Sequence, residues 1–219
     1  VDVNGWNLAT LTVTPPADSS LDFQLTVTSI ATDTDTDPGG VAVPTASAVD
    51  FIDVIVTPVS DPFTVTGDGK GLEDQIGIPV PVTVTLTDTD GSEAVTNVTI
   101  SGIPDGVILS DGTNTFQADS TNTLIGNTVD ATSWNLGTLT ATPVADSGDD
   151  FNLDFSVTVV DTDPDNSAIT DTLTTTATVP VVVQAVADTP NLDAGPDLTT
   201  AVDTPVAFLS LIHISEPTR

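Results

Sequence analysis

The chain has no cysteine and almost no basic side chains, and both absences narrow what it can do. Without cysteine it can form neither a disulfide nor a zinc–thiolate site. Only 2 lysine and arginine residues stand against 32 aspartate and glutamate residues, so the formal net charge is −30. Nucleic acids and anionic membrane surfaces are bound through basic side chains that neutralise phosphate, so this composition excludes a general affinity for either.

Groups that carry covalent catalysis are equally scarce. The chain holds one histidine, no cysteine and no G-x-S-x-G element, so nothing indicates nucleophilic catalysis. Paired carboxylates hydrolyse glycosides in a cleft that usually has aromatic platforms, yet aromatic residues make up only 4% of this chain. We therefore expect that the protein is not an enzyme. No apolar run reaches the roughly 18 residues of a membrane-spanning segment, so we also expect no direct membrane insertion.

What the chain does contain is a long internal repeat. Residues 6–18 read WNLATLTVTPPAD and residues 134–146 read WNLGTLTATPVAD, with ten of thirteen positions identical at an offset of 134 − 6 = 128. A solenoid repeat takes about 20–50 residues, whereas this period has the length of a whole domain. The sequence therefore predicts a piece of a tandem array of domains.

The repeat also predicts where the domains begin and end. The segments VIVTPVSD and VVVQAVAD close two successive copies. We expect residues 1–61 to be the C-terminal part of a truncated repeat, 62–189 a complete repeat and 190–209 the start of a third. The last ten residues, SLIHISEPTR (210–219), depart from the Thr/Val/Asp pattern and resemble sequencing-adapter read-through at the ends of metagenomic contigs. We interpret them as a non-native tail; a genuine terminal segment is the alternative.

Alternation of apolar and polar residues is the main local pattern. It runs through Leu21–Val27, Val82–Leu86, Phe151–Val159 and Leu173–Val183. A period of two predicts half-buried antiparallel strands, and proline and glycine recur at the spacing of turns in a sandwich. We therefore expect an all-β fold of antiparallel β-sandwich repeats.

Two smaller expectations concern the tryptophans and a glycine within the repeated motif. We interpret Trp6 and Trp134 as core residues at equivalent places, with stacking on sugar rings as the alternative. Gly137 interrupts the alternation between Leu136 and Leu139, which predicts a β-bulge.

Acidic residues gather at alternate positions in the turns that follow predicted strands. They are Asp33 and Asp35, then Asp88, Asp90 and Glu93, then Asp161 and Asp163. Calcium takes six to eight oxygen ligands, and carboxylates without basic partners repel one another unless a cation lies among them. Because Pro38 and Asn166 stand where an EF-hand needs glycine, these turns are not EF-hands. The alternative is that aspartate caps the local backbone of a turn.

One long stretch resembles a known family. Residues 71–112, GLEDQIGIPVPVTVTLTDTDGSEAVTNVTISGIPDGVILSDG, resemble the opening of tandem repeats in giant bacterial surface adhesins secreted by the type I (RTX-type) route, and the stretch FNLDFSVTVVDTD with VVVQAVADTP is similar to their end. The resemblance implies cadherin-like or immunoglobulin-like Greek-key sandwiches, a bacterial cell-surface or secreted extracellular location, and calcium between repeats. As partners it implies neighbouring repeats of the same chain, and a host or matrix ligand bound through other domains.

The resemblance also implies which side chains hold calcium. The loop after the second strand contributes Asp88 and Asp90, the penultimate strand contributes Asp33 and Asp161, the junction contributes Asp61 and Asp188, and the early acidic pair is Glu73 and Asp74. Asp35, Glu93 and Asp163 complete the predicted set. The chain departs from the cadherin pattern in that VSDPF carries a single aspartate, and DLTTAVDTP stands where a copy of the LED motif is expected.

These observations lead to one functional expectation and two alternatives. We expect a structural, calcium-stabilised spacer repeat that stiffens and extends the stalk of an adhesin in cell adhesion or biofilm formation. The alternatives are a carbohydrate- or protein-binding module that acts through its loops, and an accessory domain of a secreted hydrolase.

Overall fold

A computed structural model describes residues 1–32, 45–88, 90–121, 126–190, 197 and 199–206. Within these ranges the chain is all-β, as predicted, and its helical residues form only two single 3-10 turns. No helix in the described part is long and apolar enough to cross a membrane. Asp33, Asp35, Pro38 and the predicted tail lie outside the described residues.

The strands are short except for β1, β2, β7, β12 and β13. In chain order they are β1 (Phe23–Thr32), β2 (Thr45–Val54), β3 (Thr64–Gly67), β4 (Gly69–Leu72), β5 (Ile78–Pro79), β6 (Val82–Thr85), β7 (Glu93–Ser101), β8 (Ile108–Ser110), β9 (Thr115–Gln117), β10 (Val129–Asp130), β11 (Thr140–Thr142), β12 (Phe151–Thr162) and β13 (Thr170–Gln184). The 3-10 turns are η1 (Leu8–Thr10) and η2 (Leu136–Thr138).

The described chain forms two compact units. Unit 1 comprises residues 1–64, 84–98 and 156–175, and unit 2 comprises the remaining described residues. The long strands β7, β12 and β13 contribute residues to both units.

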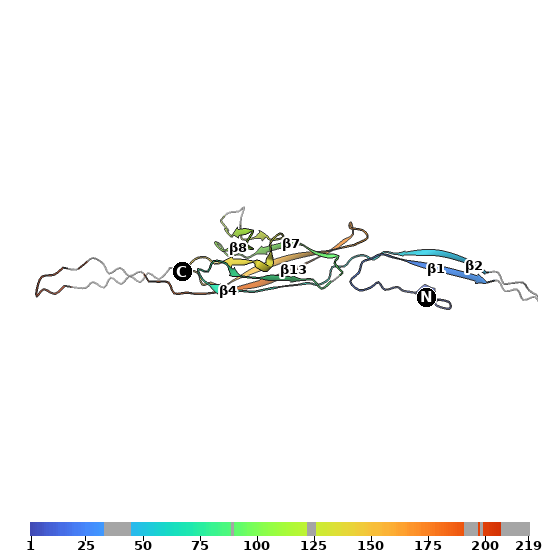
Figure 1. Cartoon of the computed structure of the whole chain (residues 1–219), viewed down its shortest axis with the longest axis horizontal. Coiled ribbons are helices and arrows are strands. Elements are labelled where there is room, and N and C mark those ends of the chain that lie inside the picture. Colours follow the sequence, from blue (N-terminus) through green and yellow to red (C-terminus); the bar gives the residue numbers. More distant parts are fainter. Residues whose placement is uncertain (33–44, 89, 122–125, 191–196, 198, 207–219) are drawn as a thin grey trace, which may run out of the picture. The chain divides into compact units, whose positions relative to one another are not determined.

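The strands pair into four sheets. Figure 1 labels several of their strands, among them β7 and β13 of the largest sheet. One sheet has the order β10-β7-β12-β13-β4 and another has the order β5-β11-β8-β9, while β1 pairs with β2 and β3 pairs with β6. The pairings within the four-stranded sheet are antiparallel, as predicted. By contrast, β13 pairs with β4 in parallel, from Val181 beside Gly69 to Gln184 beside Leu72. This pairing brings an early and a late strand of the predicted complete repeat together in the same direction.

The core of unit 2 lies between side chains of the two larger sheets. Ile100 on β7 and Phe155 on β12 come from the five-stranded sheet, and Leu109 on β8 and Ala141 on β11 come from the four-stranded sheet; all four are buried. Along β12 every second residue is buried, as a half-buried strand requires. This arrangement is consistent with a β-sandwich.

The hairpin of β1 and β2 in unit 1 has the same sequence pattern as β12 and β13 but a more exposed apolar face. Phe23 pairs with Val54 and Thr32 pairs with Thr45 in an unbroken antiparallel ladder. Figure 1 shows the hairpin of β1 and β2. Val27 is 44% exposed, whereas Phe155, its equivalent at the offset of 128, is 1% exposed. The sheet of β1 and β2 has only these two strands, so it offers these side chains little apolar cover.

Two sequence-based expectations about the repeated motif are wrong. Residues 136–138 form the 3-10 turn η2 rather than a bulge, and its last N–H, on Leu139, bonds the carbonyl of Leu136 at 3.3 Å. Neither tryptophan is a core residue, because Trp6 is 55% exposed and Trp134 is half-buried. Each precedes a 3-10 turn and not a strand.

Candidate metal centre

The segment between β2 and β3 in unit 1, residues 55–61, organises the candidate site. We call it the connecting segment. It contains Pro58 and is followed by Pro62, and because proline cannot donate to a sheet ladder, the segment stays out of the sheets. Its backbone N–H groups must then find other acceptors.

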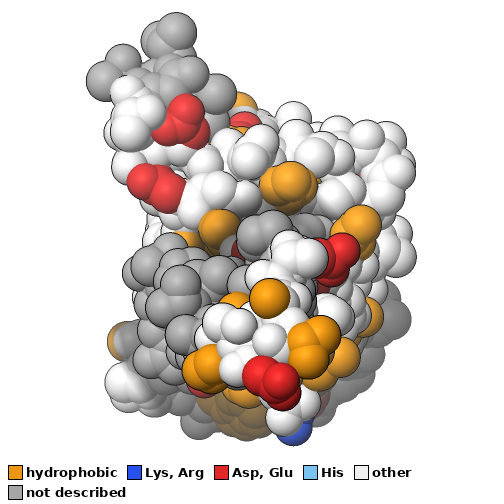
Figure 2. Space-filling view, turned by 90° about the vertical axis from the view of Figure 1, so that its left-hand side faces the viewer, with side chains coloured by type: hydrophobic (Ala, Val, Ile, Leu, Met, Phe, Trp, Pro, Cys, Tyr) orange, Lys and Arg blue, Asp and Glu red, His pale blue; other side chains and the backbone are white. Residues whose placement is uncertain are grey.

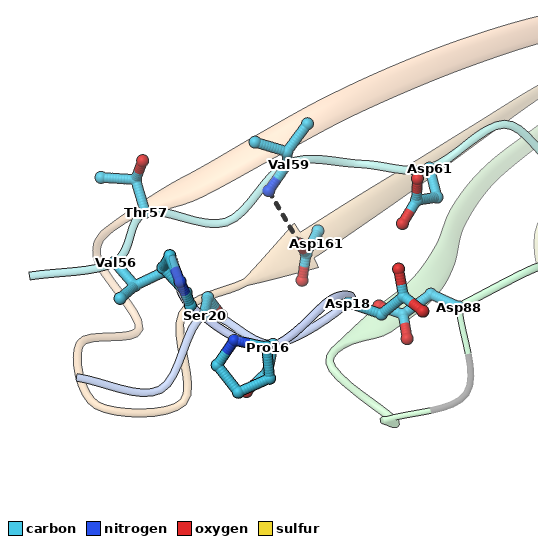
Figure 3. Close-up of a pocket in the computed structure, with 11 residues that line it drawn as sticks. Pro16, Asp18, Ser20, Val56, Thr57, Val59, Asp61, Asp88 and Asp161 are labelled. Carbon is cyan, nitrogen blue, oxygen red and sulfur yellow. Dashed lines mark hydrogen bonds between the residues drawn. The ribbon is translucent and has the colours of Figure 1, made fainter. Parts of the chain in front are cut away.

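Carboxylates accept four of these N–H groups. Val56 donates to Asp22 at 2.8 Å, Val59 to Asp161 at 3.1 Å, Ser60 to Asp171 at 2.9 Å and Asp61 to Glu93 at 2.6 Å. Figure 3 shows the bond from Val59 to Asp161. The acceptors come from β1, β7, β12 and β13 or their edges, so the connecting segment links elements that are far apart in the sequence.

Three predicted ligands meet at the end of this segment. Carboxylate oxygens of Asp61, Asp88 and Glu93 all lie within 4.8 Å of one another. Asp61 ends the connecting segment, Asp88 follows β6 and Glu93 is the first residue of β7. The sequence places these residues in two separate stretches, and the fold brings them into one cluster.

A pocket of about 320 Å³ opens beside the cluster, and Asp161 lines it together with Asp61 and Asp88. Asp18 and Ser20 add two further oxygen-bearing side chains to the lining. In Figure 3 the carboxylates of Asp18, Asp61 and Asp88 point toward a common region. A water in the liquid takes up about 30 Å³, so the pocket has room for an ion with part of its hydration shell.

The loop that carries Asp88 is held by its own hydrogen bonds. The Asp88 carboxylate accepts the N–H of Asp90 at 2.8 Å and the hydroxyl of Ser92 at 3.4 Å. The Asp90 carboxylate accepts the N–H of Ser92 at 2.8 Å. Hydrogen bonds from the side chain and the backbone of Ser92 lower the pKa of Asp90. Asp90 is exposed and is not one of the three residues whose oxygens converge.

Two buried carboxylate oxygens at this place have no hydrogen-bond partner. They are Oε2 of Glu93, in a residue that is 8% exposed, and Oδ1 of Asp161, in a residue that is 4% exposed. Leaving a buried charged oxygen unpaired is costly in free energy. The sequence of unit 1 includes no lysine, arginine or histidine that can neutralise them. These two oxygens are therefore candidate ligands for a cation.

The pKa of Glu93 reflects the same conflict. Burial raises the pKa of its carboxyl most, and the negative charges of Asp88, Asp161 and Asp61 raise it further. The hydrogen bond from the N–H of Asp61 opposes these effects. A bound cation favours the charged form of a carboxylate, so it would lower the pKa of Glu93 again.

Asp111 in unit 2 is a turn aspartate whose carboxylate is bonded by donors of the protein itself. Its carboxylate accepts the N–H groups of Thr113, Asn114 and Asn135 and the side-chain amide of Asn114. These donors, led by the backbone N–H groups of Asn114 and Asn135, hold its pKa far below the usual range. Turn capping therefore accounts for Asp111 and leaves the free oxygens of Glu93 and Asp161 unexplained.

Unit 2 contains a second acidic cluster, formed by Asp74, Asp146 and Asp188. The N–H of Asp146 donates to Asp74 at 2.9 Å, and the buried Glu73 beside it accepts the N–H of Val186. Partial desolvation by its neighbours, followed by the negative charges of Asp146, Asp74 and Glu73, raises the pKa of Asp188. The three cluster residues are exposed, and basic side chains are rare on the surface shown in Figure 2.

The internal repeat relates the two clusters. Asp18 and Asp146 are equivalent at the offset of 128, and both adopt the left-handed conformation, with φ of 56° and 58°. Asp61 and Asp188 end the equivalent segments VSD and VAD. Sequence reasoning did not select Asp18 or Asp146 as ligands, although both end the repeated motif; their identity in both copies was the available signal.

The remaining predicted ligands are placed elsewhere or lie outside the described residues. Asp163 is buried, and its Oδ1 accepts the N–H groups of Asp165 and Asn166 at 2.8 and 3.0 Å, which closes its own turn. Its Oδ2 is a further buried oxygen without a partner, but it is not part of either three-residue cluster. Asp33 and Asp35 are not among the described residues.

No protein-family model matches the chain, and comparisons with curated proteins and with solved structures found no match. The resemblance to adhesin repeats therefore stays a prediction.

Proposed function

We propose that the chain is a calcium-stabilised spacer repeat of a large secreted or cell-surface bacterial adhesin. The calcium part of the proposal rests on the pair of buried, unpartnered oxygens on Glu93 and Asp161, which lie beside the carboxylates of Asp61 and Asp88 in a unit without basic side chains. The adhesin part rests on the resemblance of residues 71–112 to adhesin repeats.

The donor set suits calcium better than other common metal ions. The available ligands are carboxylate oxygens, to which Asp18 and the unpartnered hydroxyl of Ser20 add two more oxygens around the pocket. Calcium takes six to eight oxygens in flexible geometry, and backbone carbonyls and waters complete its shell. Magnesium requires near-ideal octahedral geometry, and zinc prefers nitrogen and sulfur ligands, which this site lacks.

The ligands come from both sides of the predicted repeat boundary. Asp18 and Asp61 belong to the predicted truncated repeat, whereas Asp88, Glu93 and Asp161 belong to the predicted complete repeat. Without a cation, their like charges repel across that boundary. Bound calcium would supply a positive charge shared by both groups of ligands, so these residues would then hold the two repeats at one angle.

The second cluster is related to the first by the internal repeat. Asp146 and Asp188 repeat Asp18 and Asp61, so with Asp74 they present half of the ligand set of a further junction. Calcium sites in extracellular modules often bind with dissociation constants of about 10⁻⁴–10⁻³ M, which suits an environment with abundant calcium. We propose that such junctions stiffen and extend the stalk of the adhesin.

Small-angle scattering of the full chain tests the stiffening. The distribution of interatomic distances should be narrower and its maximum dimension longer in calcium than in chelator, because the junction no longer swings. The double variant Asp61→Asn and Asp88→Asn should lose this difference. A matched double variant, Asp2→Asn and Asp68→Asn, removes the same charge from exposed residues and should keep it. Identical wild-type profiles with and without calcium would refute the stiffening role.

A further inference from the structure

We infer that Asp171 is a positioning residue for the calcium site: it holds the connecting segment in the register that aims Glu93 and Asp161 at the ion. The inference rests on the proposed function, and it concerns a residue that neither the repeat nor the turn motifs single out. Asp171 is the second residue of β13, is exposed, and is not one of the three residues whose carboxylates converge.

In two of the predicted ligands, Glu93 and Asp161, the two carboxylate oxygens have different roles. Glu93 accepts the N–H of Asp61 with Oε1 and leaves Oε2 without a partner. Asp161 accepts the N–H of Val59 with Oδ2 and leaves Oδ1 without a partner. In each residue, one oxygen is tied to the connecting segment and the other is free for a cation. The position of the segment therefore fixes the direction in which both free oxygens point.

Asp171 holds the connecting segment between these two bonds. Ser60 lies between Val59 and Asp61, and its N–H donates to Oδ2 of Asp171 at 2.9 Å. Three consecutive N–H groups are thus bound by three carboxylates from β12, β13 and β7. Removal of the central bond frees Ser60 to rotate, and both neighbouring bonds then lose their geometry.

Asp171 could affect calcium binding through its hydrogen bond or through its charge, and two variants distinguish these effects. Asp171 carries a negative charge in the same unit, and its loss alone weakens the attraction of a cation. Asp171→Asn removes the charge but keeps a carbonyl oxygen that accepts the N–H of Ser60. Asp171→Ala removes both the charge and the acceptor. Positioning predicts that the two variants differ, whereas a pure charge effect predicts that they bind calcium equally weakly.

The experiment is a calorimetric titration of the metal-free full chain with calcium. Asp171→Ala should raise the dissociation constant of the junction site by up to about fivefold, because calcium binding must then restore the order that one hydrogen bond supplied. Asp171→Asn should change it by less than about twofold, because an exposed charge outside the cluster contributes little in salt. The control Asp50→Ala removes an exposed aspartate of the same unit that bonds its own neighbour Phe51, and it should leave the constant unchanged.

Amide hydrogen exchange in chelator gives a second readout that does not depend on bound metal. The amides of Val59, Ser60 and Asp61 should exchange faster in Asp171→Ala than in the unaltered chain, and Asp171→Asn should restore their protection. Calcium binding by the unaltered chain with equal constants for both Asp171 variants would overturn this inference and leave the proposed function standing. If the unaltered chain binds no calcium, both proposals fail together.

Discussion

Glu93 is the residue at which burial, charge and hydrogen bonding conflict most directly. It is buried beside three aspartates, and its pKa is raised because burial and their charges disfavour the ionised form. One of its oxygens accepts the N–H of Asp61, and the other has no partner. In chelator the charged form of Glu93 therefore destabilises the fold, and calcium is expected to reverse that effect.

This conflict predicts the result of Glu93→Gln. The amide oxygen can still accept the N–H of Asp61, and the amide nitrogen replaces the unpaired oxygen with a donor. In chelator at neutral pH the variant should melt at a higher temperature than the unaltered chain, but its melting should respond less to calcium. The measurement is thermal unfolding in both conditions, and a variant that is less stable in chelator would contradict this account of Glu93.

The pH dependence of the same melts carries a sign. A raised folded-state pKa means that the folded chain binds more protons than the unfolded chain between the ordinary value of 4.5 and the raised value. In chelator, the contribution of Glu93 to stability therefore falls as the pH rises through that window. The difference in stability between Glu93→Gln and the unaltered chain should grow over the same range.

At the residue scale, the sequence predicted candidate acidic residues but not how the fold would group them. It selected Asp61, Asp88 and Glu93, which the fold brings together, because acidic residues without basic partners recur at turns. It could not separate Asp90 from Asp88, since only the local hydrogen bonds with Ser92 decide which carboxylate turns away. Long-range contacts such as Ser60 with Asp171 have no local sequence signal at all.

At the element scale, alternation of residue type was a reliable guide to the long strands. The predicted strand over 151–159 became β12, and the predicted strand over 173–183 lies within β13. The 3-10 turns were missed, because three residues are too few to reveal a helical period in the sequence. The parallel contact of β4 with β13 was missed as well, because residue alternation does not specify which strands become neighbours.

The two copies of one strand offer a matched test of burial. Leu25 on β1 and Leu153 on β12 are equivalent at the offset of 128, but Leu25 is half-buried and Leu153 is fully buried. Leu153→Ala should lower the free energy of unfolding by about 2–5 kcal/mol, because it leaves a cavity in a closed core. Leu25→Ala should cost clearly less. Chemical denaturation of both variants checks this, and equal losses would show that β1 is covered as well as β12.

At the scale of the whole molecule, the main features are the internal repeat and the large negative net charge. A net charge of −30 opposes the compact state, and two acidic clusters concentrate that repulsion at particular places. The sequence predicted tandem copies from its period of 128 and a cation from its composition. It could not show that equivalent aspartates meet different neighbours in the two clusters, since that depends on the fold of residues far apart in the chain.

Thermal unfolding of the full chain in chelator, calcium and magnesium tests the central claim most directly. A ligand that binds only the folded state stabilises it by about 2.7 kcal/mol at a concentration one hundred times its dissociation constant. We expect calcium to raise the melting temperature by several degrees or more and magnesium to raise it less. The double variant Asp61→Asn and Asp88→Asn should lose much of the calcium effect. Coincident melts of the unaltered chain in calcium and in chelator would contradict the claim that its carboxylate clusters are calcium sites.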